Sequence, residues 1–369
     1  MTIHSAEQSI VRLEVAAGVD AFLERGPKPP FRALVTLDRR PIAWVDGSPD
    51  PNTARLRAAI QNAAGWPVLR RLTDRAPVPA DQPLSIVAYT GARAPENAGA
   101  RFIASLNRTG DRNLEVIAIR RDDEPPASDP GGSPVRVTTI GQRGERLNRA
   151  LNEACRIARH DLIVIVDAAT VVDAGWTDAI RSSFAARTAR AMVSLSIATG
   201  AGSPAESALD HRQRSVWGTP RTGFPAARIF DRSEALIGGL FAANGFLALR
   251  RETTTGLGFD DRLDEVAPGS PAGLLLIYRL IAAGEPVVMA PAAFVWRPVL
   301  TDPRATLARQ GRIVRDYFRA CRRFGGAGRW PVSAFALRFW CGRSRLRAMT
   351  RPGGAVLCWE WLGALAGAT

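Results

Sequence analysis

The feature that most constrains this chain is an apolar run at residues 162–166, LIVIV, which ends abruptly at Asp167. A run of five leucine, isoleucine and valine residues is too short for an ordinary helix, and it is typical of a strand buried on both faces of a parallel sheet. Open α/β sheets bind ligands at the carboxyl ends of such strands. The run therefore predicts a central strand with Asp167 at the ligand-binding edge. An Asp that only ends the strand and caps a turn is the alternative.

The segments before this run alternate between strand and helix patterns. Strands are expected at 84–90, 113–121 and 135–140, and helices at 96–109 and 144–160. This order predicts a doubly wound α/β domain with a mostly parallel sheet flanked by helices. Neither a GxGxxG motif after the first strand nor a Walker motif is present, which argues against the common dinucleotide and P-loop sites.

The rest of the chain divides around this domain. We expect a small N-terminal α+β unit, a proline-containing linker, the α/β domain and a basic helical tail at residues 1–73, 74–83, 84–304 and 305–369. In the N-terminal unit, residues 31–47 alternate like a hairpin that turns at 38–41, and residues 54–64 predict a helix.

Composition points to a reducing compartment and an anionic partner. The four cysteines have no CxxC spacing and predict free thiols, and the three histidines lie too far apart to predict a zinc site. We see no signal-peptide pattern and no apolar run of about 18 residues, so we expect a cytoplasmic chain that does not span a membrane. The net charge is +14, and residues 297–351 hold fourteen arginines against two acids.

The basic tail predicts contact with an anionic membrane surface. Residues 305–324 have apolar side chains at helical spacing with arginines on the other faces, and aromatic residues alternate with arginines up to residue 361. Charge and aromatic side chains together favour attachment to a membrane interface. The alternative is a helix packed on the α/β domain with an arginine-rich exposed face. Nucleic acid is the least favoured partner, because no known nucleic-acid motif is present.

Several segments resemble one known family. The order of SIVAYT, LEVIAI and RLNRALNEACRIARHDLIVIVDAATVVDAGW is similar to the nucleotide-binding half of family-2 glycosyltransferases, which have the GT-A fold. The similarity continues through GGLFAANGFLALRRETTTGLGFDDRL and YRLIAAGEPVVMAPAAFVWR, so that it covers about residues 30–325. It implies a nucleotide-diphosphate sugar as donor, Mg²⁺ or Mn²⁺ as cofactor, and a glycan or lipid-linked acceptor. It also implies a role in bacterial surface polysaccharide or glycolipid assembly, at the inner face of the membrane.

The resemblance assigns roles to single residues. On the nucleotide-sugar side these are Thr90, Arg120, Asp122, Asn148, Arg149, Asp167 and Arg297, and on the acceptor side Trp176 and Asn244. Asp167 matches the first carboxylate of the metal-binding D-x-D motif. Structural alternatives stay open for four of these positions: a solvated helix face for Asn148 and Arg149, core packing for Trp176, and a glycine-flanked turn for Asn244.

The sequence departs from the family where the chemistry takes place. The second Asp of the D-x-D motif is replaced by Ala169, and the late metal-site His by Arg297. The nucleoside-binding Asp is replaced by Arg120, with Asp122 two residues further on. These changes remove metal ligands and add guanidinium groups, which suit phosphate.

The catalytic base is missing as well. The family's E-D pair falls at residues 272 and 273, which are Ala and Gly, and the nearest carboxylates are Asp264 and Glu265. Loss of a general base typically costs ~10²–10⁴ in rate. Two functions therefore remain. One is a transferase whose catalysis is weak, metal-independent or partner-dependent. The other is an inactive homologue that serves as a scaffold or glycan-binding partner of another glycosyltransferase.

Overall fold

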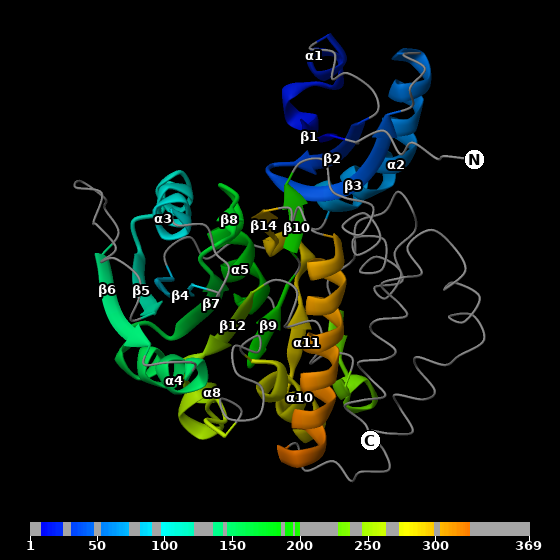
Figure 1. Cartoon of the computed structure of the whole chain (residues 1–369). Coiled ribbons are helices and arrows are strands. Elements are labelled where there is room, and N and C mark those ends of the chain that lie inside the picture. Colours follow the sequence, from blue (N-terminus) through cyan, green and yellow to red (C-terminus); the bar gives the residue numbers. More distant parts are fainter. Residues whose placement is uncertain are drawn as a thin grey trace.

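The computed structural model (Figure 1) describes most of the chain outside its long connections and its C-terminal end. The described residues are 9–24, 31–47, 53–73, 82–90, 97–121, 136–142, 146–185, 189–194, 196–199, 228–236, 246–262, 273–298 and 303–324. Within these ranges, no helix is long and apolar enough to cross a membrane.

A mixed sheet forms the centre of the molecule. Within the described residues it has eight strands in the order β11-β13-β9-β12-β7-β4-β5-β6. In chain order these are β4 (Leu84–Tyr89), β5 (Leu114–Arg121), β6 (Arg136–Gln142), β7 (Leu162–Asp167), β9 (Ala191–Val193), β11 (Arg228–Phe230), β12 (Leu247–Arg250) and β13 (Val287–Met289). Strands β7, β4, β5 and β6 are parallel neighbours, and β12 is antiparallel to both β7 and β9. The predicted α/β sheet with β7 at its centre is confirmed.

The apolar run forms β7 because both of its faces are buried. Leu162, Val164 and Val166 belong to one hydrophobic cluster, whereas Ile163 and Ile165 belong to the other, on the opposite face of the sheet. All five side chains are at most 2% exposed. Burying each side chain of this size contributes about 1.5–3 kcal/mol. A buried helix cannot divide consecutive residues between two clusters in this alternating way.

Helices cover the two faces of the sheet. Helices α3 (Ala98–Asn107) and α5 (Trp176–Ala185) pack on one face, and α4 (Leu147–Ile157) and α10 (Leu274–Ala283) on the other. Figure 1 shows α3 and α4 on opposite sides of the sheet. Shorter elements of this domain are α8 (Arg251–Gly256), η2 (Arg232–Glu234) and η3 (Pro291–Ala293).

A second, small sheet was not expected from the sequence. It pairs β10 (Ser196–Thr199) with β14 (Val295–Pro298), and β14 with β8 (Val171–Val172). Strands of two to four residues are too short to show a period, so only the folded chain reveals their pairing.

The N-terminal residues form a three-stranded sheet at the top of Figure 1. Its elements are β1 (Ser9–Glu14), η1 (Val15–Ala17), α1 (Val19–Glu24), β2 (Phe31–Leu37), β3 (Arg40–Gly47) and α2 (Thr53–Thr73). The predicted hairpin is confirmed, and its two-residue turn at Asp38 and Arg39 has positive φ angles of 49° and 64°. The parallel pairing of β1 with β2 was not predicted. Residues 74–81 of the predicted linker lie outside the described residues, so the domain boundary stays a prediction.

Contacts connect this N-terminal sheet to the large domain. Leu34 and Trp44 belong to the same hydrophobic cluster as Ile165. The Arg12 side chain forms an ion pair with Asp173, which follows β8, and Arg40 donates a hydrogen bond to Ser182 on α5. The N-terminal unit therefore packs beside the segment that follows Asp167.

The helix expected at residues 305–324 is α11 (Pro303–Phe324). Ile313, Val314, Tyr317 and Phe318 are at most 9% exposed and belong to the main hydrophobic cluster, together with residues of α10. The Tyr317 hydroxyl donates a hydrogen bond of 2.8 Å to the backbone oxygen of Leu236. Of the two alternatives for this helix, packing on the domain is the one observed. The tail beyond residue 324 lies outside the described residues.

Buried acidic groups in this core predict a loss of stability at alkaline pH. Burial raises the pKa of Cys155 to about 12, and burial also raises the pKa values of Cys321 and Tyr317 above their ordinary ranges. At a pH between the pKa in the unfolded chain and the higher pKa in the folded protein, only the unfolded chain loses these protons. This deprotonation stabilises the unfolded chain relative to the folded protein. The melting temperature should therefore be level up to about pH 8.5 and fall steadily above about pH 9. In the Tyr317→Phe/Cys321→Ala variant the fall should be shallower, and an unchanged slope would contradict this origin.

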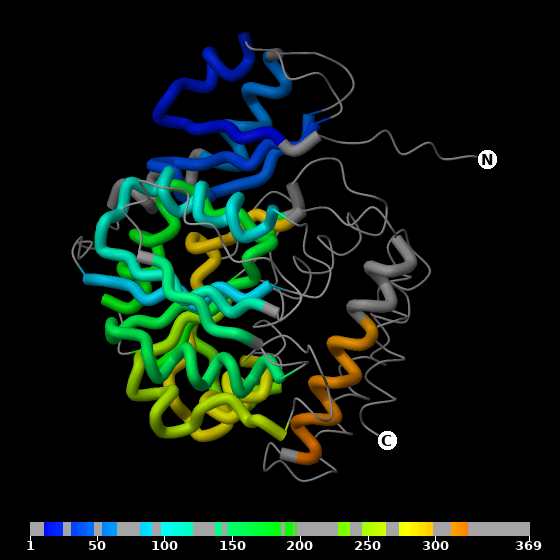
Figure 2. Tube along the Cα trace, turned by 60° about the vertical axis from the view of Figure 1, so that its left-hand side comes forward, coloured from blue at the N-terminus to red at the C-terminus, as the bar shows by residue number. Residues whose placement is uncertain are grey.

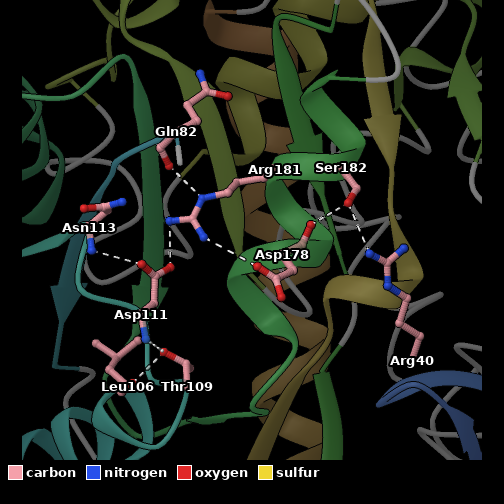
Figure 3. A network of polar contacts seen from close by, with 9 residues as sticks. All are labelled: Arg40, Gln82, Leu106, Thr109, Asp111, Asn113, Asp178, Arg181 and Ser182. Atoms are coloured by element: carbon pink, nitrogen blue, oxygen red, sulfur yellow. Dashed lines mark hydrogen bonds and ion pairs between the residues drawn. The ribbon is translucent and has the colours of Figure 1, made fainter. Parts of the chain in front are cut away.

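A buried ion pair connects α5 to the start of the sheet (Figure 3). The Arg181 side chain, 2% exposed, lies 2.6 Å from a carboxylate oxygen of Asp111, and its Nε donates a hydrogen bond to the backbone oxygen of Gln82. Asp111 also accepts a hydrogen bond from the backbone N–H of Asn113. These contacts join the turn after α3, the start of β4 and the middle of α5.

Replacing Arg181 should therefore destabilise the fold strongly. The Arg181→Met variant leaves the carboxylate of Asp111, 9% exposed, without its cation, which should lower the free energy of unfolding by about 3–5 kcal/mol. Urea denaturation measures this change. Arg181→Met/Asp111→Asn should recover part of the loss, and exposed Arg101→Met should change stability by less than about 0.5 kcal/mol. A loss below about 1 kcal/mol for Arg181→Met would contradict the assignment.

Candidate functional site

Three predicted site residues meet at the carboxyl edge of neighbouring parallel strands. In the β4–β7 pair, Tyr89 lies opposite Asp167, and in the β4–β5 pair it lies opposite Ile119. Thr90 and Arg120 each come one residue later along their strands. The register therefore brings Thr90, Arg120 and Asp167 to one edge of the sheet, where open α/β folds bind their ligands.

The Asp167 side chain holds its own turn. Its Oδ1 accepts a hydrogen bond of 2.9 Å from the backbone N–H of Ala169. The Thr170 hydroxyl and backbone N–H both donate to the backbone oxygen of Asp167, at 2.7 and 3.0 Å. The turn-capping interpretation of Asp167 is therefore confirmed. Asp167 also lies at the carboxyl edge of the sheet, and its part in ligand binding stays a prediction. The carboxylate is half-buried and fixed in direction by the turn.

Helix α4 begins at the same edge. Strand β6 is parallel to β5, and α4 follows it after a short connection, so the first turn of α4 lies at the carboxyl edge. Asn148 is 4% exposed, whereas Arg149 next to it is exposed. The solvated-face alternative therefore fits Arg149 and is wrong for Asn148. Arg146, at the N-cap position, makes no side-chain capping bond, so the partial positive charge of the helix start is not satisfied by that side chain.

The small sheet brings Arg297 to the Asp167 turn. Trp296 of β14 pairs with Val171 of β8, and the two strands are antiparallel. Arg297 therefore continues alongside the turn of residues 167–170. Arg120, Arg149 and Arg297 thus belong to segments that end, begin or pass at the edge of the sheet that also holds Asp167.

The described residues do not fit a divalent cation well. No group of three His, Cys, Asp or Glu side chains that could hold a metal ion is found among the residues that the structure describes. At the second D-x-D position, Ala169 offers a backbone N–H that donates to Asp167 instead of an oxygen ligand. Mg²⁺ and Mn²⁺ need oxygen ligands, and Arg297 adds a like charge. An anion fits this set of side chains better.

On the acceptor side, Trp176 lies in the core. It is 1% exposed and packs edge-to-face on Phe246, with ring centroids 5.1 Å apart. This placement matches the packing alternative and not the floor of an open pocket. Four other predicted residues, Asp122, Asn244, Asp264 and Glu265, lie outside the described residues.

The position of the family's catalytic base is filled by packing. Gly273 caps the start of α10 with a positive φ of 86°. A Cβ atom there would collide with the side chain of Leu247, which is 2% exposed. Residues 274–278, which form the first turn and a half of α10, are all at most 4% exposed. The family resemblance predicts the loss of an acid at residues 272 and 273, and the structure shows that the side chain of Leu247 fills the space beside Gly273.

Substitution of Gly273 tests this packing. Gly273→Ala should lower the free energy of unfolding by about 2–4 kcal/mol, because left-handed strain and overpacking against Leu247 add. Gly99 on α3 is the matched control, since a Cβ there meets nothing within 4 Å. Gly99→Ala should be neutral or stabilising by up to about 1 kcal/mol. Equal effects of the two substitutions in thermal or urea denaturation would show that position 273 is not closed.

The similarity of this chain to known proteins lies in its structure. No protein-family model matches the sequence, and no curated protein is similar to it. The mannosyltransferase PcManGT from Pyrobaculum calidifontis, solved in complex with GDP-Man and Mn²⁺, is similar in structure with a TM-score of 0.52 and 17% identity. The similarity covers 85% of this chain and 97% of that chain. This chain has a GT-A-like glycosyltransferase fold.

A second glycosyltransferase structure, TarS 1–349 of S. aureus, is more distant. Its TM-score is 0.41 at 9% identity, over 78% of this chain and 90% of that chain. The fold predicted from the family resemblance is therefore confirmed by the mannosyltransferase. Membership of family 2 and the loss of catalytic groups stay predictions.

Proposed function

We propose that this protein is a family-2-like glycosyltransferase homologue that binds a nucleotide-diphosphate sugar mainly through arginines. Its sugar transfer is weak, metal-independent or dependent on a partner protein. The proposal is supported by the glycosyltransferase fold and by the composition of the carboxyl edge. Arg120 and Arg297 are placed near Asp167 by strand register, and the first turn of α4 lies at the same edge.

These groups are suited to a diphosphate. Guanidinium forks make paired, charge-assisted hydrogen bonds with phosphate oxygens, and a helix N-terminus adds backbone N–H donors. In the usual family mechanism, a divalent cation neutralises the diphosphate. Here we assign that neutralisation to the arginines, because Ala169 and Arg297 stand where metal ligands are expected. Thr90 and the buried Asn148 then lie beside the nucleoside and diphosphate.

The observation that carries the catalytic part of the proposal is the start of α10. At Gly273, the side chain of Leu247 and the buried residues that follow leave no room for a carboxylate, whereas the neighbouring position 272 lies outside the described residues. A base would have to come from another segment, and Asp264 and Glu265 are the nearest candidates in the sequence.

The same observation favours a second function. A chain without a base can act as an inactive scaffold or glycan-binding partner of another glycosyltransferase. The two functions differ in one measurable respect: the first requires a nucleotide-sugar complex, and the second does not.

We place this function at the inner face of a bacterial membrane, in the assembly of surface polysaccharide or glycolipid. The acceptor would be a glycan or a lipid-linked sugar, and the basic tail would hold the protein peripherally at the anionic surface. The family resemblance and the charge of residues 297–351 support this setting.

Calorimetric titration tests the proposal. A panel of nucleotide sugars that includes GDP-mannose and UDP-glucose is titrated into the full chain with EDTA or with Mn²⁺. At least one should bind with an affinity that EDTA changes by less than about threefold, and Asp167→Asn should leave this affinity similar. Arg120→Gln and Arg297→Gln should each weaken binding roughly 10- to 100-fold, the value of a charge-assisted hydrogen bond.

The control is Arg156→Gln, an exposed arginine in the last turn of α4, which should have no effect. If none of the nucleotide sugars binds, the scaffold function is favoured. Robust Mn²⁺-dependent sugar transfer by the purified chain alone would contradict both functions.

A further inference from the structure

Helix α11 presents a row of arginines on its outer side. Arg312, Arg319 and Arg323 are exposed, and their spacing of seven and four residues places them on one face of the helix. We call these three residues the basic face. Half-buried Arg315 and Arg322 flank it, and Arg315 forms an ion pair with Asp316. At 1.5 Å per residue, the basic face extends over roughly 16 Å.

The opposite face of α11 is firmly docked. Val314, Tyr317, Phe318 and Cys321 are at most 1% exposed, and the Tyr317 hydroxyl is bonded to the backbone oxygen of Leu236. Figures 1 and 2 both show α11, in orange, at the periphery of the described fold. Tyr317 and Phe318 are part of the core and cannot enter a membrane while the helix is docked. Between residues 311 and 323, the exposed side chains are the three arginines of the basic face.

We propose that the basic face of docked α11 binds the surface of an anionic lipid bilayer electrostatically, without insertion of this helix. A straight row of cations on a rigid helix matches a plane of many phosphate groups better than one small anion. Continuity in sequence supports this partner, because the tail from residue 325 onward adds further arginines interleaved with aromatic residues. The proposal does not rest on nucleotide-sugar binding and can hold for an inactive homologue.

Nucleic acid fits the basic face less well. Proteins that bind single strands combine positive charge with exposed aromatic rings on which bases stack. On α11, both Tyr317 and Phe318 are at most 1% exposed, so neither ring offers a stacking surface. The observations thus favour lipid headgroups.

The experiment compares two triple variants of the full chain with equal charge change. Arg312→Gln/Arg319→Gln/Arg323→Gln removes the basic face. Arg101→Gln/Arg108→Gln/Arg112→Gln removes three exposed arginines on α3 and in the turn that follows it. Binding is measured by co-sedimentation with vesicles of phosphatidylcholine containing phosphatidylglycerol, with pure phosphatidylcholine vesicles, and with a single-stranded oligonucleotide. Circular dichroism melts confirm that all variants fold.

The basic-face variant should bind anionic vesicles about 100-fold more weakly, or roughly fivefold per arginine, which corresponds to about 1 kcal/mol each. The α3 variant should stay within about threefold of the unchanged protein, and the difference should vanish at high salt because surface charges are screened. Equal losses in both variants, or no loss in either, would overturn the proposal. So would a loss confined to the oligonucleotide. The vesicle assay contains no nucleotide sugar. A failure of the lipid-binding proposal would therefore leave the calorimetric test of nucleotide-sugar binding unaffected.

Discussion

The burial of β7 on both of its faces is the constraint on which the rest of the structure depends. Alternate side chains of this strand enter two hydrophobic clusters, so the sheet must be covered by helices on both sides. Because β7 ends at Asp167, the same burial fixes where the polar edge of the sheet begins. Strand register then brings Thr90 and Arg120 to that edge. The two-residue strand β8 pairs with β14, which contains Arg297.

At that edge, the electrostatic character differs from the one that the family resemblance implies. A carboxylate pair holding a cation attracts a diphosphate through the metal, whereas guanidinium groups attract it directly. Both arrangements neutralise the same negative charge, but they respond differently to chelators and to substitution of Asp167. In this chain, Oδ1 of Asp167 accepts the Ala169 N–H and so stabilises a turn. The turn alone is thus a structural reason for an Asp at this position, independent of the metal-binding role that the resemblance implies.

The start of α10, where the family resemblance places the catalytic base, is closed by packing. Leu247 fills the space beside Gly273, and the first turns of α10 lie in the hydrophobic cluster. A deleted acid on an open surface could be restored by one substitution, but a position closed by a buried leucine resists this because protein interiors are close-packed. The carboxyl edge near Asp167 and the start of α10 therefore have different properties. The first has polar and cationic side chains, while the second is stabilised by apolar contacts.

The sequence by itself determined the alternation of strands and helices, the central place of residues 162–167, the hairpin at 31–47 and the helix near 305–324. These features follow from periodicity and turn residues, which are local. Its resemblance to the family also predicted which acids are missing. Only the tertiary structure decided that Asn148 and Trp176 are buried, that α11 docks its apolar face, and that Leu247 closes the space beside Gly273. The pairing of the small sheet β10-β14-β8 was also decided only by the tertiary structure. Each depends on segments distant in the chain packing against one another, and no local pattern specifies which side chain will fill a given space.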